Sequence, residues 1–189
     1  IGQYGPWLAS QMQDPPKLSF RNDLWSNIQD WKPSAHAKAQ EQIGEPLIKE
    51  TITVTVKRKF NYDGLHIEEL TWQLPYGRPV EAIFMKPESS TGKLPAILGL
   101  HDHAGKKYFG NRKITKTSDN QHPLIVEHQK SDYEGRAWAN EMAKRGYAVL
   151  VHDAFSFASR RVFYEDMAGI EWGPLKAEGR TDENPEDVR

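Results

Sequence analysis

The sequence has no cysteine among its 189 residues. Disulfide bonds, thiolate metal ligands and a cysteine nucleophile are therefore excluded. The absence of cysteine permits both a cytoplasmic and a secreted protein, and of the two we expect a cytoplasmic location. An excess of one charge is also absent, because 25 Lys and Arg residues are balanced by 26 Asp and Glu residues. This balance gives no sign of a basic surface for nucleic acid or anionic lipid. No run reaches the ~20 apolar residues that span a bilayer. We expect neither a nucleic-acid partner nor a membrane partner.

The most distinctive stretch is LPAILGLHDHAG at residues 94–105. Its apolar part, residues 96–100, is short and unbroken, which is typical of a strand buried on both faces of a parallel sheet. The residues that follow such a strand lie at its carboxyl end, where α/β sheets bind their ligands. The sequence therefore predicts a central strand here, with residues 101–105 forming one wall of a functional site.

Residues 1–50 are expected to form an N-terminal helical arm. Asn22 or Asp23 can cap a first helix, and four apolar residues recur at helical spacing after this cap. These four residues are Leu24, Trp25, Ile28 and Trp31. Pro33 is predicted to begin a second helix, which Gly44 ends.

Residues 51–162 form the second predicted part, which opens with three strands. Residues 51–60 alternate apolar and polar side chains, so that Ile52, Val54 and Val56 are expected on a buried face. Two more strands are predicted at residues 65–74 and 79–85. The alternation of the middle strand slips at Glu68 and Glu69, which indicates a β-bulge in that strand. The three strands should form an antiparallel meander.

A crossover follows the predicted central strand. Residues 106–132 are expected to be a long polar loop of the kind that is usually functional, with Lys113 solvated. Residues 136–145 carry a helical pattern, and residues 147–151 form a second apolar strand that ends at His152 and Asp153. Strand, helix and strand in this order predict a right-handed parallel βαβ unit. The fold class is therefore α/β.

Residues 163–189 are the third predicted part. This segment is acidic and lacks helical or strand periodicity, and the chain runs from Ile1 to Arg189 without an initiator methionine. We expect the chain to be one piece of a longer protein, in which this segment leads into a C-terminal half. The sequence leaves a homo-oligomeric state open.

Two segments carry a family resemblance: LPAILGLHDHAGKKYFG at residues 94–110 and RGYAVLVHDAFSFASRR at residues 145–161. With the meander before them, they resemble the N-terminal half of an α/β-hydrolase, and within that superfamily the dienelactone hydrolase and acetyl xylan esterase-like family. The resemblance covers roughly residues 48–162, and the helical arm suits the longer bacterial members. It implies a serine ester hydrolase, acting as a carboxylesterase, acetyl esterase or lactone hydrolase, with no cofactor and no metal.

In such hydrolases the loop after the first parallel strand supplies a backbone N–H to the oxyanion hole. By position, the resemblance assigns this role to His103, with Ala104 as the next candidate, and it implies that the amide faces a cavity. Many family members have glycine where this chain has Asp102 or Ala104, so we expect a stiffer loop here.

The nucleophile that the resemblance requires is missing from the sequence. No Gly-x-Ser-x-Gly motif occurs, and neither Ser156 nor Ser159 is flanked by glycine. In this family the nucleophile, the acid and the histidine all follow the segment that is recognised here. The resemblance therefore implies that the C-terminal half of the same hydrolase, on the same or a separate chain, is the partner that carries the triad. The substrate would be a small-molecule ester.

Two alternatives stay open at this point. The His101-x-His103 pair after a strand is also found in metal-dependent hydrolases, with Asp102, His122, His128, His152 and Asp153 as further candidate ligands. The chain could also be a non-catalytic hydrolase-like domain. A search for Gly-x-Ser-x-Gly in residues beyond Arg189 separates this last alternative from the esterase.

Several polar side chains near the two strand ends have both functional and structural interpretations. His101, Asp102 and Arg160 are candidates for substrate contact. For His101 itself the sequence favours hydrogen bonding within the loop over either functional role. For Arg160 and its neighbour Arg161 it favours anchoring of their loop through acidic partners. For Asp153 the sequence favours a structural role, in which its carboxylate accepts N–H groups of the following turn.

Overall fold

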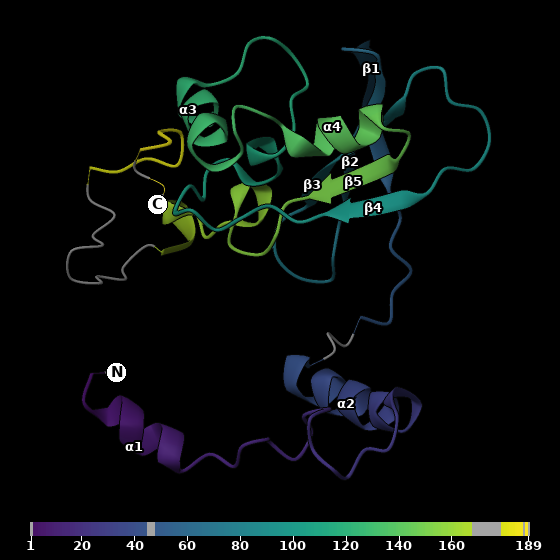
Figure 1. The fold of residues 1–189 in the computed structure, drawn as a ribbon. Coiled ribbons are helices and arrows are strands. Elements are labelled where there is room, and N and C mark those ends of the chain that lie inside the picture. Colours follow the sequence, from purple (N-terminus) through teal and green to yellow (C-terminus); the bar gives the residue numbers. More distant parts are fainter. Residues whose placement is uncertain (1, 45–47, 168–178, 187, 189) are drawn as a thin grey trace. The chain divides into compact units, whose positions relative to one another are not determined.

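The computed structural model describes residues 2–44, 48–167, 179–186 and 188. The chain forms two compact units, Ile1–Lys49 and Glu50–Arg189. The first contains helices α1 (Tyr4–Ser10) and α2 (Ile28–Ile43), and the second contains the sheet (Figure 1). Among the described residues, no helix is both long enough and apolar enough to cross a bilayer. The predicted acidic segment at 163–189 lies partly outside the described residues.

Helix α2 begins later than the sequence predicts. Its N-cap is Asn27, whose Oδ1 accepts the N–H groups of Gln29 (2.9 Å) and Asp30 (3.1 Å). The predicted cap at Asn22 or Asp23 is therefore wrong. Asn22 instead closes a turn, since its Oδ1 accepts the N–H of residue 24 at 3.1 Å.

Pro33 lies inside α2 and does not begin a second helix. Proline lacks an N–H group and therefore removes one intrahelical hydrogen bond, a loss that the rest of this 16-residue helix tolerates near its first turn. The helix ends at Gly44 as predicted, with φ of +70° at this residue.

The second unit is built on a mixed five-stranded sheet of order β1-β2-β3-β5-β4. Strands β1, β2 and β3 pair antiparallel, and β5 pairs antiparallel with β3 and parallel with β4. This arrangement confirms the predicted meander followed by a parallel strand pair. The strands are β1 (Thr55–Tyr62), β2 (Leu65–Trp72), β3 (Val80–Pro87), β4 (Ala96–Gly99) and β5 (Ala148–His152).

The irregularity that the sequence places in the middle strand lies in its partner. The register of β1 against β2 shifts between Val56 and Arg58, so Lys57 is the extra residue, while β2 pairs with β3 without a break. Strand β1 is also an edge strand, in which Val56 is 40% exposed, and Val54, just before it, is 51% exposed. The prediction of a buried face on this strand is therefore wrong for both valines.

Strand β4 was expected at the centre of the sheet and lies at its edge. Leu98 is 58% exposed and Leu100, just beyond the strand, is 64% exposed. An unbroken apolar run is typical of a strand that is covered on both faces and paired on both edges. Among the described residues, β4 pairs with β5 on one edge and its other edge is unpaired.

The long segment before the crossover is not a simple loop. It contains the short 3₁₀ helix η1 (Gly110–Lys113) and helix α3 (Pro123–Asp132). Pro123 stands at the first position of α3, where its missing N–H costs nothing, and His122 Nδ1 accepts the N–H of residue 124 at 3.2 Å. The remaining helices are α4 (Trp138–Lys144), η2 (Ala158–Arg160) and η3 (Tyr164–Met167).

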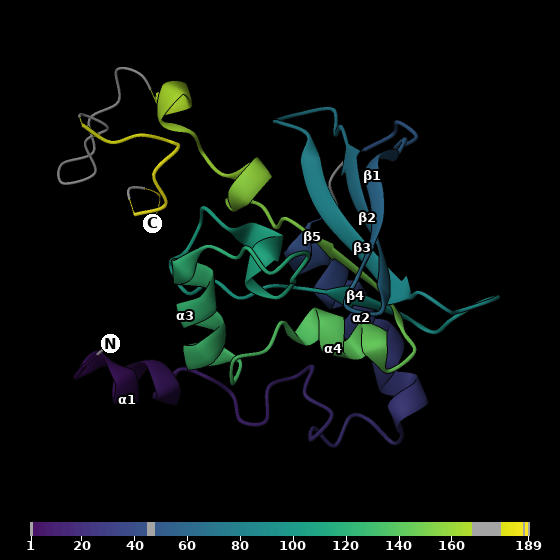
Figure 2. The same ribbon diagram turned by 90° about the horizontal axis from the view of Figure 1, so that it is seen from above.

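The core lies between one face of the sheet and α4, which packs against β2, β3 and β5 (Figure 1 and Figure 2). Ala139 and Ala143 of α4 are fully buried against this face. Gly99 lets the helix approach closely, because a Cβ there would lie 2.9 Å from the Val151 side chain and 3.3 Å from Trp138. The loops after β4 and β5 leave the same end of the sheet, as parallel strands require.

Candidate functional site

The loops after β4 and β5 are joined through His101. Its Nε2 accepts the N–H of Ala154 at 3.1 Å, and its Nδ1 lies 3.0 Å from the carbonyl oxygen of Asp102. Since Nε2 accepts, Nδ1 carries the hydrogen and donates it, which fixes the neutral tautomer. Burial lowers the pKa of His101. Both nitrogens are thus engaged within the protein, and substrate contact by His101 stays a prediction.

Asp102 belongs to a network of polar side chains from η1 and α3. One carboxylate oxygen accepts the hydroxyl of Tyr133 and lies 3.1 Å from His128 Nε2, and the other lies 3.6 Å from Lys113 Nζ. His128 is itself buried and its Nδ1 lies 3.0 Å from Asp132 Oδ2. Burial acts to raise the pKa of Asp102, but the two hydrogen bonds and the lysine charge lower it overall.

Lys113 is the largest departure from the sequence-based expectation. The side chain was expected in solvent and is 0% exposed. Its Nζ donates to the carbonyl oxygens of Asp102 (2.8 Å) and His103 (2.9 Å) and lies 4.3 Å from the centre of the Phe157 ring. Burial lowers the pKa of Lys113, and the carboxylate of Asp102 opposes this shift.

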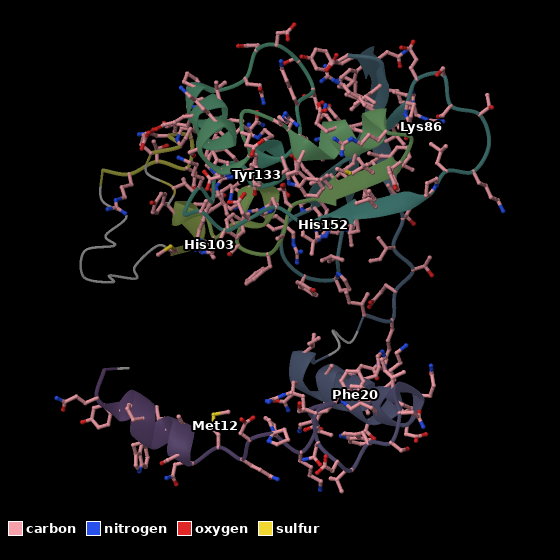
Figure 3. The ribbon with its side chains drawn as sticks, in the orientation of Figure 1. Met12, Phe20, Lys86, His103, Tyr133 and His152 are labelled. Atoms are coloured by element: carbon pink, nitrogen blue, oxygen red, sulfur yellow. The ribbon has the colours of Figure 1, made fainter. Side chains whose placement is uncertain are left out.

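His103 and Ala104 are exposed (Figure 3 labels His103). The backbone N–H groups of these two residues donate no hydrogen bond to any described part of the chain. Ala104 has φ of +33°, in the left-handed region that favours glycine. The ring of His103 is held by the N–H of Gly105, which donates to Nδ1 at 3.2 Å, and by an edge contact with Phe157. Two adjacent amides are therefore free to meet a ligand.

A cavity of about 780 Å³ lies on the helix-covered side of the meander, beside η1 and η2. Arg78, Glu81, Asn111, Ser159 and Arg161 are among its lining residues, and none of residues 101–105 lines it. The two free amides therefore open at the surface outside this cavity. The amides of His103 and Ala104 were expected to face a cavity, and they do not face this cavity.

Asp153 has the structural role that the sequence favours. Its Oδ1 accepts the backbone N–H (2.8 Å) and the side-chain amide (2.9 Å) of Asn111, and its Oδ2 accepts the backbone N–H (3.1 Å) and the hydroxyl (2.7 Å) of Ser159. The residue is 1% exposed, and burial raises its pKa against these four bonds. The Ser159 hydroxyl is thereby committed, since it also accepts the N–H of Glu81 at 3.0 Å.

Of the two arginines after β5, Arg161 anchors its loop. It donates to the carbonyl oxygens of Ala158 (3.1 Å) and Asp182 (2.8 Å), and its guanidinium lies 3.9 Å from the ring centre of Phe163. The guanidinium carbon of Arg160 lies 5.9 Å from the ring centre of Phe155. The role of Arg160 in substrate contact stays a prediction.

The histidines that could form a metal site are dispersed. His122 caps α3, His128 pairs with two aspartates, and His152 Nδ1 lies 2.9 Å from the carbonyl oxygen of Asp153. Within the described ranges, no group of three or more His, Asp or Glu side chains is arranged to hold a metal ion. His101 and His103 use ring nitrogens in local hydrogen bonds.

Sequence reasoning missed Lys113, Tyr133 and the pairing of His128 with Asp102. Lys113 and His128 lie in the segment 106–132, which the sequence predicts as a polar loop, and Tyr133 directly follows it. The available signal was the helical start at residues 122–123, with a proline at the first turn, because a helix there brings His128 and Tyr133 back toward the strand end.

No protein-family model and no curated protein sequence matches the chain. Among solved structures, it is similar to a protein from Bacteroides fragilis assigned as an acetyl xylan esterase, with 17% identity and a TM-score of 0.60. The chain shares this fold. An acetyl xylan esterase from Paenibacillus sp. R4 matches with 16% identity and a TM-score of 0.33, over 73% of this chain and 36% of that one.

The Bacteroides match covers 86% of this chain and 40% of the other. The chain therefore spans about two fifths of the length of the esterase structure that it resembles. The similarity in structure supports an esterase-like fold. Membership of the dienelactone hydrolase branch stays a prediction.

Proposed function

We propose that this chain is the N-terminal part of a serine ester hydrolase acting on small acyl esters, and that residues 101–105 supply part of its oxyanion hole. The observation that carries the proposal is the pair of free amides at His103 and Ala104, directly after a parallel strand. The shared fold with an esterase structure of greater length supports it.

In the proposed reaction a serine of the C-terminal half attacks the ester carbonyl carbon. The carbonyl electron pair moves to the oxygen, and the tetrahedral oxyanion accepts hydrogen bonds from the amides of His103 and Ala104. A histidine of the same half takes the serine proton and gives it to the leaving alkoxide as this intermediate collapses, and water then hydrolyses the acyl-serine to the acid and the free serine. The exposed edge of β4 beside Leu98 and Leu100 is where this half would pack.

The proposal is tested by comparing the complete protein with residues 1–189 on p-nitrophenyl acetate. We expect hydrolysis by the complete protein and none by residues 1–189, because the nucleophile is not among them. Activity of the isolated chain, or inactivity of the folded complete protein toward a panel of acetyl esters and lactones, contradicts the proposal.

A more specific test of the proposal removes one of the two amide N–H groups. Replacing Ala104 by lactic acid deletes its N–H and keeps its methyl group, and it should lower kcat by ~100- to 1000-fold, as loss of an oxyanion donor does. The same replacement at Ala37 in α2, in the other unit of the chain, is the control and should leave kcat within about threefold.

A further inference from the structure

The peptide units that carry the two free amides are held from behind by one buried ammonium group. Lys113 is 0% exposed, and its Nζ donates to the carbonyl oxygens of Asp102 and His103 at 2.8 and 2.9 Å. Lysine is rarely buried to this degree unless it is paired. Here both carbonyls belong to the loop that is the candidate site, so the cost of burial is compensated by contacts with that loop.

Because peptide units are planar, these contacts also fix the direction in which the two amide N–H groups point. The carbonyl of Asp102 and the N–H of His103 belong to one planar unit, and so do the carbonyl of His103 and the N–H of Ala104. Neither peptide bond is cis, so carbonyl and N–H point in opposite directions in each unit. Because both carbonyls face Lys113, both N–H groups face away from it, toward the exposed side of the loop.

The position of Lys113 is itself fixed by neighbouring groups. The carboxylate of Asp102 lies 3.6 Å from Nζ and is held by His128 and Tyr133, and the ring of Phe157 lies 4.3 Å from Nζ on the loop after β5. The lysine backbone carbonyl accepts the side-chain amide of Gln129 at 3.2 Å. The ammonium is therefore held from η1, α3 and both loops.

The ammonium group acts on the amides through its charge as well as through its position. A cation bound to a carbonyl oxygen draws electron density through the peptide unit, so that the N–H at the other end becomes a stronger donor. Two neighbouring units polarised in the same way present two strengthened donors on the side of the loop away from Lys113. Such a pair suits an oxyanion better than a neutral carbonyl oxygen.

We propose that Lys113 is a positioning residue for the oxyanion hole, which aims and polarises the amides of His103 and Ala104 by holding the carbonyls of the same peptide units. This inference rests on the proposed function for its catalytic meaning. The orientation of the amides by Lys113 is testable without it.

The first test uses the unmodified chain. NMR should detect scalar coupling across the hydrogen bonds between Lys113 Nζ and the carbonyl carbons of Asp102 and His103. Detection supports the proposal, and it needs no substitution that could unfold the protein. Absence of both couplings, with the Lys113 ammonium signal observed, overturns it.

The second test changes the charge at constant shape. Because the chain has no cysteine, Lys113→Cys introduces a single thiol that can be alkylated under denaturing conditions before refolding. The thiolate displaces bromide from 2-bromoethylamine to give a cationic lysine analogue, or from 1-bromopropane to give a neutral side chain of equal length.

We expect the amide signals of His103 and Ala104 to shift in the neutral form and to return to their original positions in the cationic form. The signals of Asn111 and Ser159, which bind Asp153, should stay in place in both forms and report an intact fold. Equal positions of the two loop signals in both forms overturn the proposal.

The third test measures catalysis in the complete protein. Lys113→Met should lower kcat by about 100-fold with KM within about threefold, since the amides bind the transition state more strongly than the ester. Lys130→Met, an exposed lysine of α3, is the matched control and should stay within about twofold.

A folded Lys113→Met protein with unchanged kcat overturns the positioning role. If the complete wild-type protein is inactive on all esters, the proposed function fails, and the two NMR tests still decide whether Lys113 aims the amides.

Discussion

A His-Asp pair lies at the carboxyl end of each of the two parallel strands, and the protein uses the two aspartates in opposite ways. His101 and His152 each place Nδ1 about 3 Å from the carbonyl oxygen of the next residue, at 3.0 Å for Asp102 and 2.9 Å for Asp153. The local motif is thus the same after β4 and β5. The difference lies in what surrounds each carboxylate.

The Asp102 carboxylate is 27% exposed and meets a lysine, a histidine and a tyrosine, which together lower its pKa against the effect of burial. The Asp153 side chain is almost fully enclosed and meets neutral donors from Asn111 and Ser159, so burial dominates and its pKa rises. The second loop therefore satisfies its polar groups internally. The first is held by a cation and leaves two amides free.

The largest expected effect comes from crowding the enclosed carboxylate of Asp153. In Gly110→Ala the new Cβ would lie 2.1 Å from Asp153 Oδ1 and 2.6 Å from the Ala158 Cβ, at φ of +50°. We expect a loss of about 2–5 kcal/mol in the free energy of unfolding, from the left-handed backbone and the overpacking together. Urea denaturation measures it.

Gly105→Ala is the matched control on the Asp102 side. It has φ of +64° and nothing within 4 Å of the added Cβ, so it should cost about 1–2 kcal/mol from backbone strain alone. Equal losses for the two variants would show that the Asp153 carboxylate is not tightly enclosed.

The second prediction compares Asp102→Asn with Asp153→Asn between pH 7 and pH 3. At pH 7 the first should cost about 1.5–3 kcal/mol, since it weakens hydrogen bonds to a charged group. A lowered folded-state pKa gives stability that is lost as the pH falls through it, so the difference between wild type and Asp102→Asn should shrink toward acid.

A raised folded-state pKa has the reverse consequence for Asp153. The folded protein disfavours the charged carboxylate, and the wild type regains this stability as the pH falls through the folded-state pKa. The difference between wild type and Asp153→Asn should therefore grow toward acid. Slopes of the same sign for both variants in urea titrations at several pH values contradict the comparison.

The smallest expected effect concerns the strained residue in the first loop. Ala104 has φ of +33°, which costs about 1–2 kcal/mol for a residue with a Cβ, whereas glycine adds about 0.4–1 kcal/mol of unfolded-state entropy. Ala104→Gly should therefore stabilise the protein by up to about 1 kcal/mol in thermal or urea unfolding. Ala37→Gly, inside α2, should instead destabilise it by about 1 kcal/mol, and stabilisation by both would point to an unrelated cause.

Patterns that depend on neighbouring residues in the chain could be predicted well. Alternation and apolar runs located all five strands, and the helical pattern at residues 136–145 located α4, because side-chain periodicity follows from backbone geometry. The structural role of Asp153 followed from its place at a strand end. The bulge was detected but assigned to the wrong strand, since a phase slip belongs to a pair and pairing decides which strand carries the extra residue.

The sequence by itself determined the order of the five strands, the place of α4 before β5, and a polar, glycine-containing loop after a parallel strand. The tertiary structure decided that β4 lies at an edge and that Lys113 is buried behind the loop. Burial of a lysine depends on acceptors that lie about ten residues away along the chain and on rings from another loop. No local pattern encodes such contacts, because they exist only after the strand ends and α3 have come together.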